Sequence, residues 1–186
     1  SLKKKKQFIL IANHNSHMDT MAIMSSIPPR YIHRVHPIAA ADFFGGSKFK
    51  EKLMRYMVNA TLIPRKRPES KEDVDPIKVM SNLIEKGRSI IVYPEGSRGV
   101  PGVMTDFKKG IGYLINQNPH VDVIPVYLDG IHKTLPKGKN LILPYNCEII
   151  FGDTIQFDSF EVDDIVKKSE SEFNQLIKDR SWKNLC

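Results

Sequence analysis

The sequence contains a histidine and an aspartate whose types and spacing suit acid–base chemistry. They are His14 and Asp19, in the segment Asn13-His14-Asn15-Ser16-His17-Met18-Asp19, which directly follows a short apolar run. A carboxylate that hydrogen-bonds one ring nitrogen of a histidine fixes the tautomer, and the other nitrogen is then free to take a proton. The pair can therefore form a general base with the carboxylate that orients it.

The same segment also fits the start of a helix. Ser16 followed three residues later by Asp19 resembles a capping box, with Ser16 as the N-cap and Asp19 near the positive end of the helix dipole. On spacing alone this interpretation is at least as good as the catalytic one. The two are compatible, because a residue just before the N-cap and one in the first turn can lie close together.

A metal site is a third interpretation of this segment. The pair His14 and His17, together with Asp19, could be proposed as ligands. No motif elsewhere in the sequence supplies a further ligand, and the other histidines are scattered. We predict no metal site, and we interpret His17 as a residue of the helix start that can line the pocket.

A turn with a conspicuous arginine follows the apolar run Ser89–Val92. It reads Tyr93-Pro94-Glu95-Gly96-Ser97-Arg98-Gly99. Proline and glycines at the end of a strand make a tight turn whose backbone amides can point at an anion, and arginine adds a planar cation suited to phosphate. An ordinary surface turn with an exposed charge pair is the alternative.

Two further segments are weaker signals. Leu62-Ile63-Pro64-Arg65-Lys66-Arg67 places three cations at the end of a short apolar run, which by itself fits a solvated loop. Val123-Ile124-Pro125-Val126-Tyr127 is, as a bare pattern, a buried strand that contains a proline.

Short apolar runs alternate with amphipathic stretches along the chain, which predicts a single α/β domain over residues 1–186 with a central, mostly parallel or mixed sheet flanked by helices. Active sites in such sheets collect at the carboxyl ends of the strands. We expect strands at Gln7–Asn13, Val35–Ala41, Ala60–Ile63, Ser89–Tyr93, Val121–Tyr127 and Cys147–Phe151, and helices at Ser16–Ser26, Ser47–Val58, Asp73–Glu85, Phe107–Asn116 and Asp163–Lys178.

Composition and charge narrow the class of protein. Hydrophobic residues make up 41% and charged residues 26% of the 186, which indicates a globular protein. No uncharged stretch approaches the ~20 residues of a spanning helix, so we expect none. Two cysteines make no disulfide framework, and we therefore expect a reducing, cytoplasmic setting. Residues 1–67 hold thirteen Lys and Arg against three acids, and such a basic region attracts anions unless it is merely a solvated surface.

Taken together and in this order, the four segments resemble the motifs of the glycerolipid acyltransferase superfamily, which includes the bacterial 1-acyl-glycerol-3-phosphate acyltransferases. Its first motif, N-H-x-S-x-x-D, is matched by Asn13, His14, Ser16 and Asp19, and its third, F-P-E-G-T-R, is matched by Tyr93–Arg98 with two conservative changes. The fourth motif is similar to Val123–Val126, and Phe107–Gly110 is similar to the F-K-x-G segment that commonly follows the third.

The resemblance implies an O-acyltransferase. His14, oriented by Asp19, would take the proton from an acceptor hydroxyl that attacks the thioester of acyl-CoA or an acyl carrier protein, with no bound cofactor. Asn13 and the backbone amides after His14 could stabilise the developing oxyanion. The acceptor, a lysophospholipid such as 1-acyl-glycerol-3-phosphate, would be bound by Arg65, Glu95, Gly96, Ser97 and Arg98, with Glu95 orienting Arg98 or a hydroxyl. Ser16 is better explained as a cap than as a nucleophile.

Two departures from the family accompany these expectations. The second motif, usually G-x-x-F-I-x-R, reads Asn59-Ala60-Thr61-Leu62-Ile63-Pro64-Arg65 and lacks the glycine. The N-terminal helical segment of many relatives is absent, so we expect a domain cut from a longer protein. Phe43 and Phe44 either dip into a membrane interface or an acyl groove, or pack in the core.

Function and location follow as expectations. The basic first third predicts peripheral binding to an anionic membrane surface, at the inner face of the membrane. The alternative to catalysis is a lipid- or carrier-binding domain on the same scaffold. Nucleic-acid binding is disfavoured, because no recognition motif accompanies the positive charge.

Overall fold

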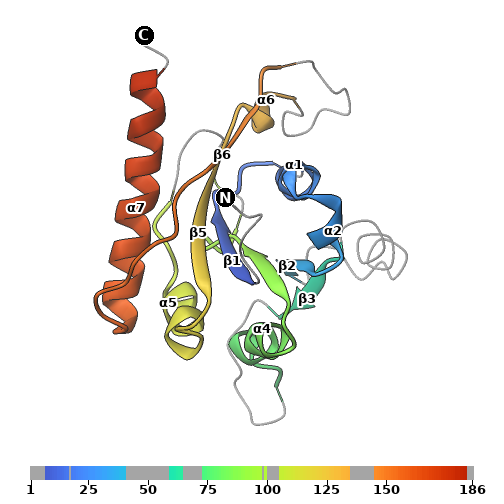
Figure 1. The fold of residues 1–186 in the computed structure, drawn as a ribbon, viewed down its shortest axis with the longest axis vertical. Coiled ribbons are helices and arrows are strands. Elements are labelled where there is room, and N and C mark those ends of the chain that lie inside the picture. Colours follow the sequence, from blue (N-terminus) through green and yellow to red (C-terminus); the bar gives the residue numbers. More distant parts are fainter. Residues whose placement is uncertain are drawn as a thin grey trace.

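The structure, a computed structural model, describes residues 7–16, 18–40, 59–64, 73–97, 99, 105–134 and 145–183 (Figure 1). Its six strands form one sheet in the order β3-β2-β4-β1-β5-β6. All neighbouring strands are parallel except β5 and β6, which are antiparallel. The predicted α/β class with a mixed, mostly parallel sheet is therefore confirmed. The strands are β1 Phe8–Ala12, β2 Val35–Ala40, β3 Thr61–Ile63, β4 Ser89–Val92, β5 Asp122–Asp129 and β6 Glu148–Phe151.

The central strands are buried on both faces, which explains their nearly unbroken apolar sequences. In β1, alternate residues enter two different hydrophobic clusters. Ile9 and Ile11 pack in the cluster that contains Ile111 and Phe173, whereas Leu10 packs with the residues that cover the opposite face. Each run predicted as a strand is a strand, with ends that differ by at most two residues.

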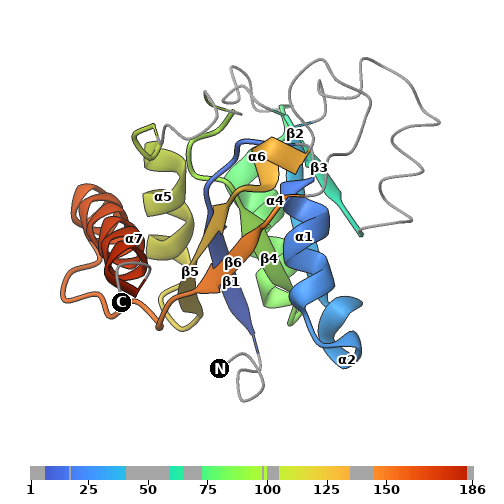
Figure 2. The same ribbon diagram turned by 90° about the horizontal axis from the view of Figure 1, so that it is seen from above.

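Helices cover both faces of the sheet (Figure 2). α4 and α5 contribute to the first cluster together with α7, and α1 contributes to the second, which also includes Ile131 of α6. The helices are α1 Asp19–Ser26, α2 Pro29–Ile32, α4 Pro76–Glu85, α5 Lys109–Gln117, α6 Ile131–Thr134 and α7 Val162–Lys183.

Most helices match the sequence expectations, with differences at their ends. α4 begins later than predicted, because Asp75 is its N-cap and accepts a hydrogen bond from the Ile77 amide at 2.9 Å. Gly87 follows the helix in the left-handed region at φ 73°, a conformation that glycine adopts readily at the C-terminal end of a helix. The single turns α2 and α6 are too short for periodicity to predict. The helix expected at Ser47–Val58, with Phe43 and Phe44 before it, lies outside the described residues.

Among the residues that the structure describes, no helix combines the length and apolar character needed to cross a bilayer.

Candidate active site

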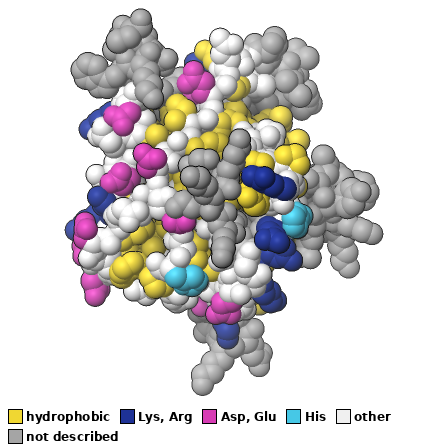
Figure 3. Space-filling model, viewed as in Figure 1, with side chains coloured by type: hydrophobic (Ala, Val, Ile, Leu, Met, Phe, Trp, Pro, Cys, Tyr) yellow, Lys and Arg dark blue, Asp and Glu magenta, His cyan; other side chains and the backbone are white. Residues whose placement is uncertain are grey.

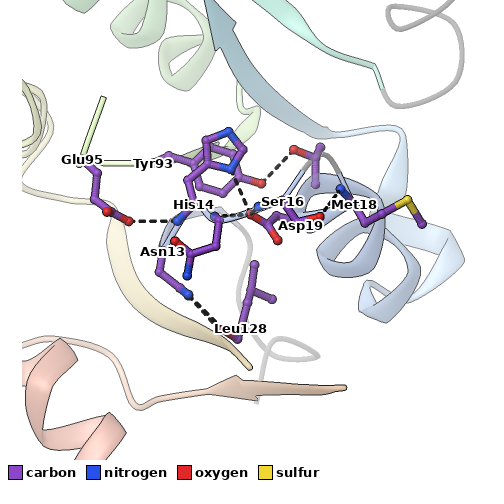
Figure 4. Close-up of polar contacts among 10 residues, drawn as sticks. Asn13, His14, Ser16, Met18, Asp19, Tyr93, Glu95 and Leu128 are labelled. Atoms are coloured by element: carbon purple, nitrogen blue, oxygen red, sulfur yellow. Dashed lines mark hydrogen bonds and ion pairs between the residues drawn. The ribbon is translucent and has the colours of Figure 1, made fainter. Parts of the chain in front are cut away.

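The site residues follow two adjacent parallel strands at the same edge of the sheet. Ile11 of β1 pairs with Val92 of β4, so Asn13 and His14 emerge next to the turn that begins at Tyr93 (Figure 4). This edge holds the carboxyl ends of both strands, where the sequence predicted a site.

The His14 ring is bonded to a buried carboxylate. Nδ1 of His14 lies 3.0 Å from Oδ2 of Asp19, and the Asp19 side chain is 1% exposed whereas that of His14 is 21% exposed. The same Oδ2 accepts hydrogen bonds from the backbone amides of Asn15 and Ser16, both at 2.7 Å. With Nδ1–H donating to a fixed carboxylate, Nε2 is the nitrogen that can accept a proton.

The predicted capping box is formed only in part. Helix α1 begins at Asp19 with Met18 as its N-cap, so Ser16 is not the N-cap that we expected. The Ser16 hydroxyl instead accepts a hydrogen bond from the Met18 amide at 3.2 Å. The other half of the box is present, because Asp19 reaches back to the Ser16 amide. Asp19 therefore holds the turn and the histidine ring with one oxygen.

The groups that we expected to stabilise the oxyanion are hydrogen-bonded within the protein. The side-chain amide of Asn13 is buried, and it bonds the backbone of Leu128 twice, donating to the carbonyl at 2.9 Å and accepting from the amide at 2.8 Å. The amides of Asn15 and Ser16 are bonded to Asp19, as described above. The geometry thus gives Asn13 the role of joining the ends of β1 and β5, and it does not support an oxyanion role for these donors.

Glu95 has a different position from the one expected for a substrate ligand. Its side chain is 2% exposed. Oε1 accepts from the His14 backbone N–H at 2.9 Å, and Oε2 accepts from the amide and the hydroxyl of Thr105 at 3.2 and 3.0 Å. Because both oxygens are bonded within the protein, the geometry does not support the expected contact of Glu95 with an acceptor hydroxyl, and it gives Glu95 the role of holding the backbone of His14. The other half of that expectation, that Glu95 orients Arg98, stays a prediction, because Arg98 lies outside the described residues.

The rest of this turn also bonds the backbone of His14. The Gly99 amide donates to the His14 carbonyl at 3.1 Å, so both backbone polar groups of His14 are bonded to this turn. Gly96 adopts φ 74°, a left-handed conformation that glycine tolerates best, and its amide closes the turn by donating to the Tyr93 carbonyl at 3.0 Å. Gly96 and Ser97 are exposed beside the site. Arg65, Arg98 and His17 lie outside the described residues.

The missing glycine of the second motif has a conformational explanation. Asn59 stands in its place and adopts φ 56°, and no other described residue except glycine has positive φ. Asparagine is among the residues that best tolerate the left-handed region. The substitution therefore keeps the backbone shape that glycine would allow.

Comparison with known proteins identifies the family. The model of the family described as Acyltransferase matches residues 1–129, which is more than half of the chain. The chain belongs to this acyltransferase family.

Named relatives are similar to this chain over different shares of their length. A chloroplastic 1-acyl-sn-glycerol-3-phosphate acyltransferase of Brassica napus is 37% identical over 82 residues, which cover 44% of this chain and 24% of the relative. A 1-acyl-sn-glycerol-3-phosphate acyltransferase of Limnanthes alba is 27% identical over 188 residues, which cover 97% of this chain and 60% of the relative. The chain thus spans less than two thirds of these relatives.

A solved structure has the same fold. The 1-acyl-sn-glycerophosphate (LPA) acyltransferase PlsC from Thermotoga maritima superposes with a TM-score of 0.70 at 22% identity, covering 96% of this chain and 68% of that one. At this identity the likeness shows that the two chains share a fold.

Some residues of the site were not found by sequence reasoning. Tyr93 stacks on the His14 ring with ring centroids 4.1 Å apart, and its hydroxyl lies 2.8 Å from that of Thr20. Thr105 and Leu128 bond Glu95 and Asn13. The only sequence signal for Tyr93 was its place in the third motif. No motif or spacing pointed to Thr20, Thr105 or Leu128. Within the part of the chain that the structure describes, no group of three or more His, Cys, Asp or Glu side chains is arranged to hold a metal ion.

Proposed function

We propose that this acyltransferase moves a fatty acyl group from acyl-CoA or an acyl carrier protein to the hydroxyl of a lysophospholipid such as 1-acyl-glycerol-3-phosphate. The observation that carries the proposal is the 3.0 Å contact between His14 Nδ1 and Asp19 Oδ2, with His14 partly exposed at the edge of the sheet. The names of the relatives support the substrate class.

The proposed reaction needs no covalent enzyme intermediate and no bound cofactor. His14 Nε2 takes the proton of the acceptor hydroxyl while its oxygen attacks the thioester carbonyl carbon. The tetrahedral intermediate then collapses, the carbon–sulfur bond breaks, and the leaving thiolate receives the proton from His14. General-base assistance of this kind is worth roughly 10²–10⁴-fold in rate.

The acceptor phosphate requires cations near this base. We assign this role to Arg65 and Arg98, which end the second and third motifs, and to the exposed turn at Gly96 and Ser97. The placement of this turn supports the assignment, because Glu95, which precedes Gly96, is hydrogen-bonded to His14 itself. A phosphate bound there would lie beside the base.

Binding to an anionic membrane surface would give the enzyme access to its lipid acceptor. Thirteen of the 28 Lys and Arg lie in residues 1–67, against three acids. In Figure 3, most acidic side chains lie on the side of α7, where cations are interspersed with them, and a further group of cations lies on the opposite side. Arg30 and Arg34 are exposed in this first region. We propose peripheral binding at the cytoplasmic face, at ~1 kcal/mol for each cation near the surface. Vesicles of phosphatidylserine should bind the protein and phosphatidylcholine vesicles should not.

Thiol release from acyl-CoA in the presence of lysophosphatidic acid tests the reaction. His14→Ala should abolish release, whereas the matched control His120→Ala, which removes an exposed imidazole outside the site, should not. A panel of lyso-lipid acceptors, with products identified by mass spectrometry, should show which acceptor is used. Near-normal turnover by His14→Ala would refute the mechanism. Vesicle binding without thiol release by the wild-type protein would instead support the non-catalytic alternative.

A further inference from the structure

One face of the His14 imidazole is covered by an aromatic ring. The ring of Tyr93 stacks on it with the centroids 4.1 Å apart and the planes inclined by 20° (Figure 4). The hydrogen bond to Asp19 fixes one atom of the imidazole, but the ring can still pivot about that bond. A flat contact against one face opposes this motion, because pivoting would push the two rings into each other.

The same tyrosine is tied to the helix that carries the carboxylate. Its hydroxyl lies 2.8 Å from Oγ1 of Thr20, the residue that follows Asp19 in the first turn of α1. Burial raises the pKa of the Tyr93 hydroxyl above its ordinary value, and the nearby Asp19 raises it further against the opposite effect of the Thr20 hydrogen bond. The phenol therefore stays neutral and needs a hydrogen-bond partner within the protein.

We propose that Tyr93 and Thr20 are positioning residues that fix His14 and Asp19 relative to each other. Tyr93 leaves the end of β4, its ring holds the plane of His14, and its hydroxyl holds the turn in which Asp19 lies. The resemblance to F-P-E-G-T-R places a phenylalanine at this position in the family motif, so the hydroxyl and its bond to Thr20 belong to this chain's own version of the site. The kinetic part of the inference rests on the proposed function.

Kinetics of four variants test the two contacts separately. Tyr93→Leu removes the stacked ring, and we expect kcat to fall roughly 10- to 100-fold, with KM for donor and acceptor within about 2-fold of wild type, because a misplaced base slows chemistry without weakening binding. Thr20→Val removes the hydrogen bond between the half-buried phenol and helix α1 and should lower kcat roughly 5-fold or more, whereas Thr20→Ser, which keeps the hydroxyl, should not. Adding Tyr93→Phe to Thr20→Val should leave kcat low, because the hydrogen bond that holds the turn of Asp19 is still missing, and a return to the wild-type kcat would count against this bond as a positioning contact.

The tautomer of His14 gives a readout that needs no turnover. Nitrogen-15 NMR of the imidazole should show a single tautomer with the proton on Nδ1 in the wild type and in Thr20→Ser, and a mixture in Tyr93→Leu. Thermal denaturation would show which variants are folded, and Thr20→Val against Thr20→Ser keeps the test available if Tyr93→Leu does not fold.

The outcomes separate the inference from the proposed function. If the wild type releases no thiol but Tyr93→Leu or Thr20→Val still mixes the tautomers, the function fails and the positioning inference stands. If folded Tyr93→Leu and Thr20→Val keep both the wild-type tautomer and the wild-type kcat, the inference is overturned. A rise in KM with unchanged kcat would also overturn it, because it would place Tyr93 in substrate binding.

Discussion

The carboxylate of Glu95 accepts a hydrogen bond from the backbone N–H of His14 at 2.9 Å, although the two residues lie 81 positions apart. With its other oxygen Glu95 bonds the amide and hydroxyl of Thr105. A buried carboxylate therefore joins the segment that carries the proposed general base to the segment that follows the third motif. Glu95 shapes the site from inside the protein.

Replacing Glu95 should reduce the rate and stability and leave acceptor binding nearly unchanged. Glu95→Ala leaves the His14 and Thr105 amides without a partner, at a cost of about 1–3 kcal/mol each if they stay buried, and we expect a roughly 100-fold lower kcat because His14 is displaced. Glu95→Gln keeps one oxygen acceptor and should fall between this variant and wild type. Steady-state kinetics and urea denaturation measure both effects. A large rise in the acceptor KM with normal stability would instead show that Glu95 binds substrate.

Asp19→Asn separates the charge of Asp19 from its geometry. Oδ2 accepts all three hydrogen bonds to described residues, and the buried Oδ1 has no partner among them. An asparagine can place its oxygen at Oδ2 and its NH₂ group at Oδ1, so the tautomer of His14 is kept while the negative charge is lost. We expect kcat to fall by roughly 10²–10⁴-fold, because nothing then stabilises the imidazolium.

Stability provides the control for this change. Asp19→Ala removes all three hydrogen bonds and should lower the denaturation midpoint well below that of Asp19→Asn. If Asp19→Asn kept at least half of the wild-type kcat, the carboxylate would have only the structural role that the capping pattern suggested.

The hydrophobic pattern predicted the sheet well, because apolar runs such as Phe8–Ala12 have few other ways to be buried. The His14–Asp19 pair could also be predicted from the sequence, since both residues lie in one turn. The roles of Glu95 and Asn13 were not, because their partners include backbone groups 81 and 115 residues away, and no local spacing encodes such contacts. Ser16 was predicted as the N-cap because its type favours that position, yet its hydroxyl accepts from the Met18 amide and helix α1 begins at residue 19.

Acid should weaken the fold partly through His36. Burial lowers the pKa of His36 below its ordinary 6.5, the Arg88 guanidinium lowers it further, and a hydrogen bond with Asn59 partly opposes them. The unfolded chain then binds a proton more readily than the folded protein, so stability contributed by neutral His36 is present above pH 6.5 and is lost as the pH falls below it. Urea denaturation between pH 7.5 and 5.5 should show a smaller decline for His36→Gln than for wild type, with His120→Gln as the control for loss of an imidazole. Equal declines in His36→Gln and wild type would exclude this residue as a cause.

Asn59 offers a test of the backbone shape that the second motif requires. At φ 56° an alanine is strained by roughly 1–2 kcal/mol and a glycine is not, so Asn59→Gly should be more stable than Asn59→Ala even though glycine has the more flexible unfolded chain. Both variants lose the side-chain hydrogen bonds to the Val35 carbonyl and His36, so the difference between them isolates the effect of the backbone conformation.

At Asn82, which is exposed within helix α4, the order should reverse, with alanine more stable than glycine by about 1 kcal/mol. Free energies of unfolding from urea titrations of the four variants measure both pairs. The same order at both positions would mean that residue 59 does not need the left-handed conformation, and the match of Asn59 to the motif's glycine would lose its physical basis.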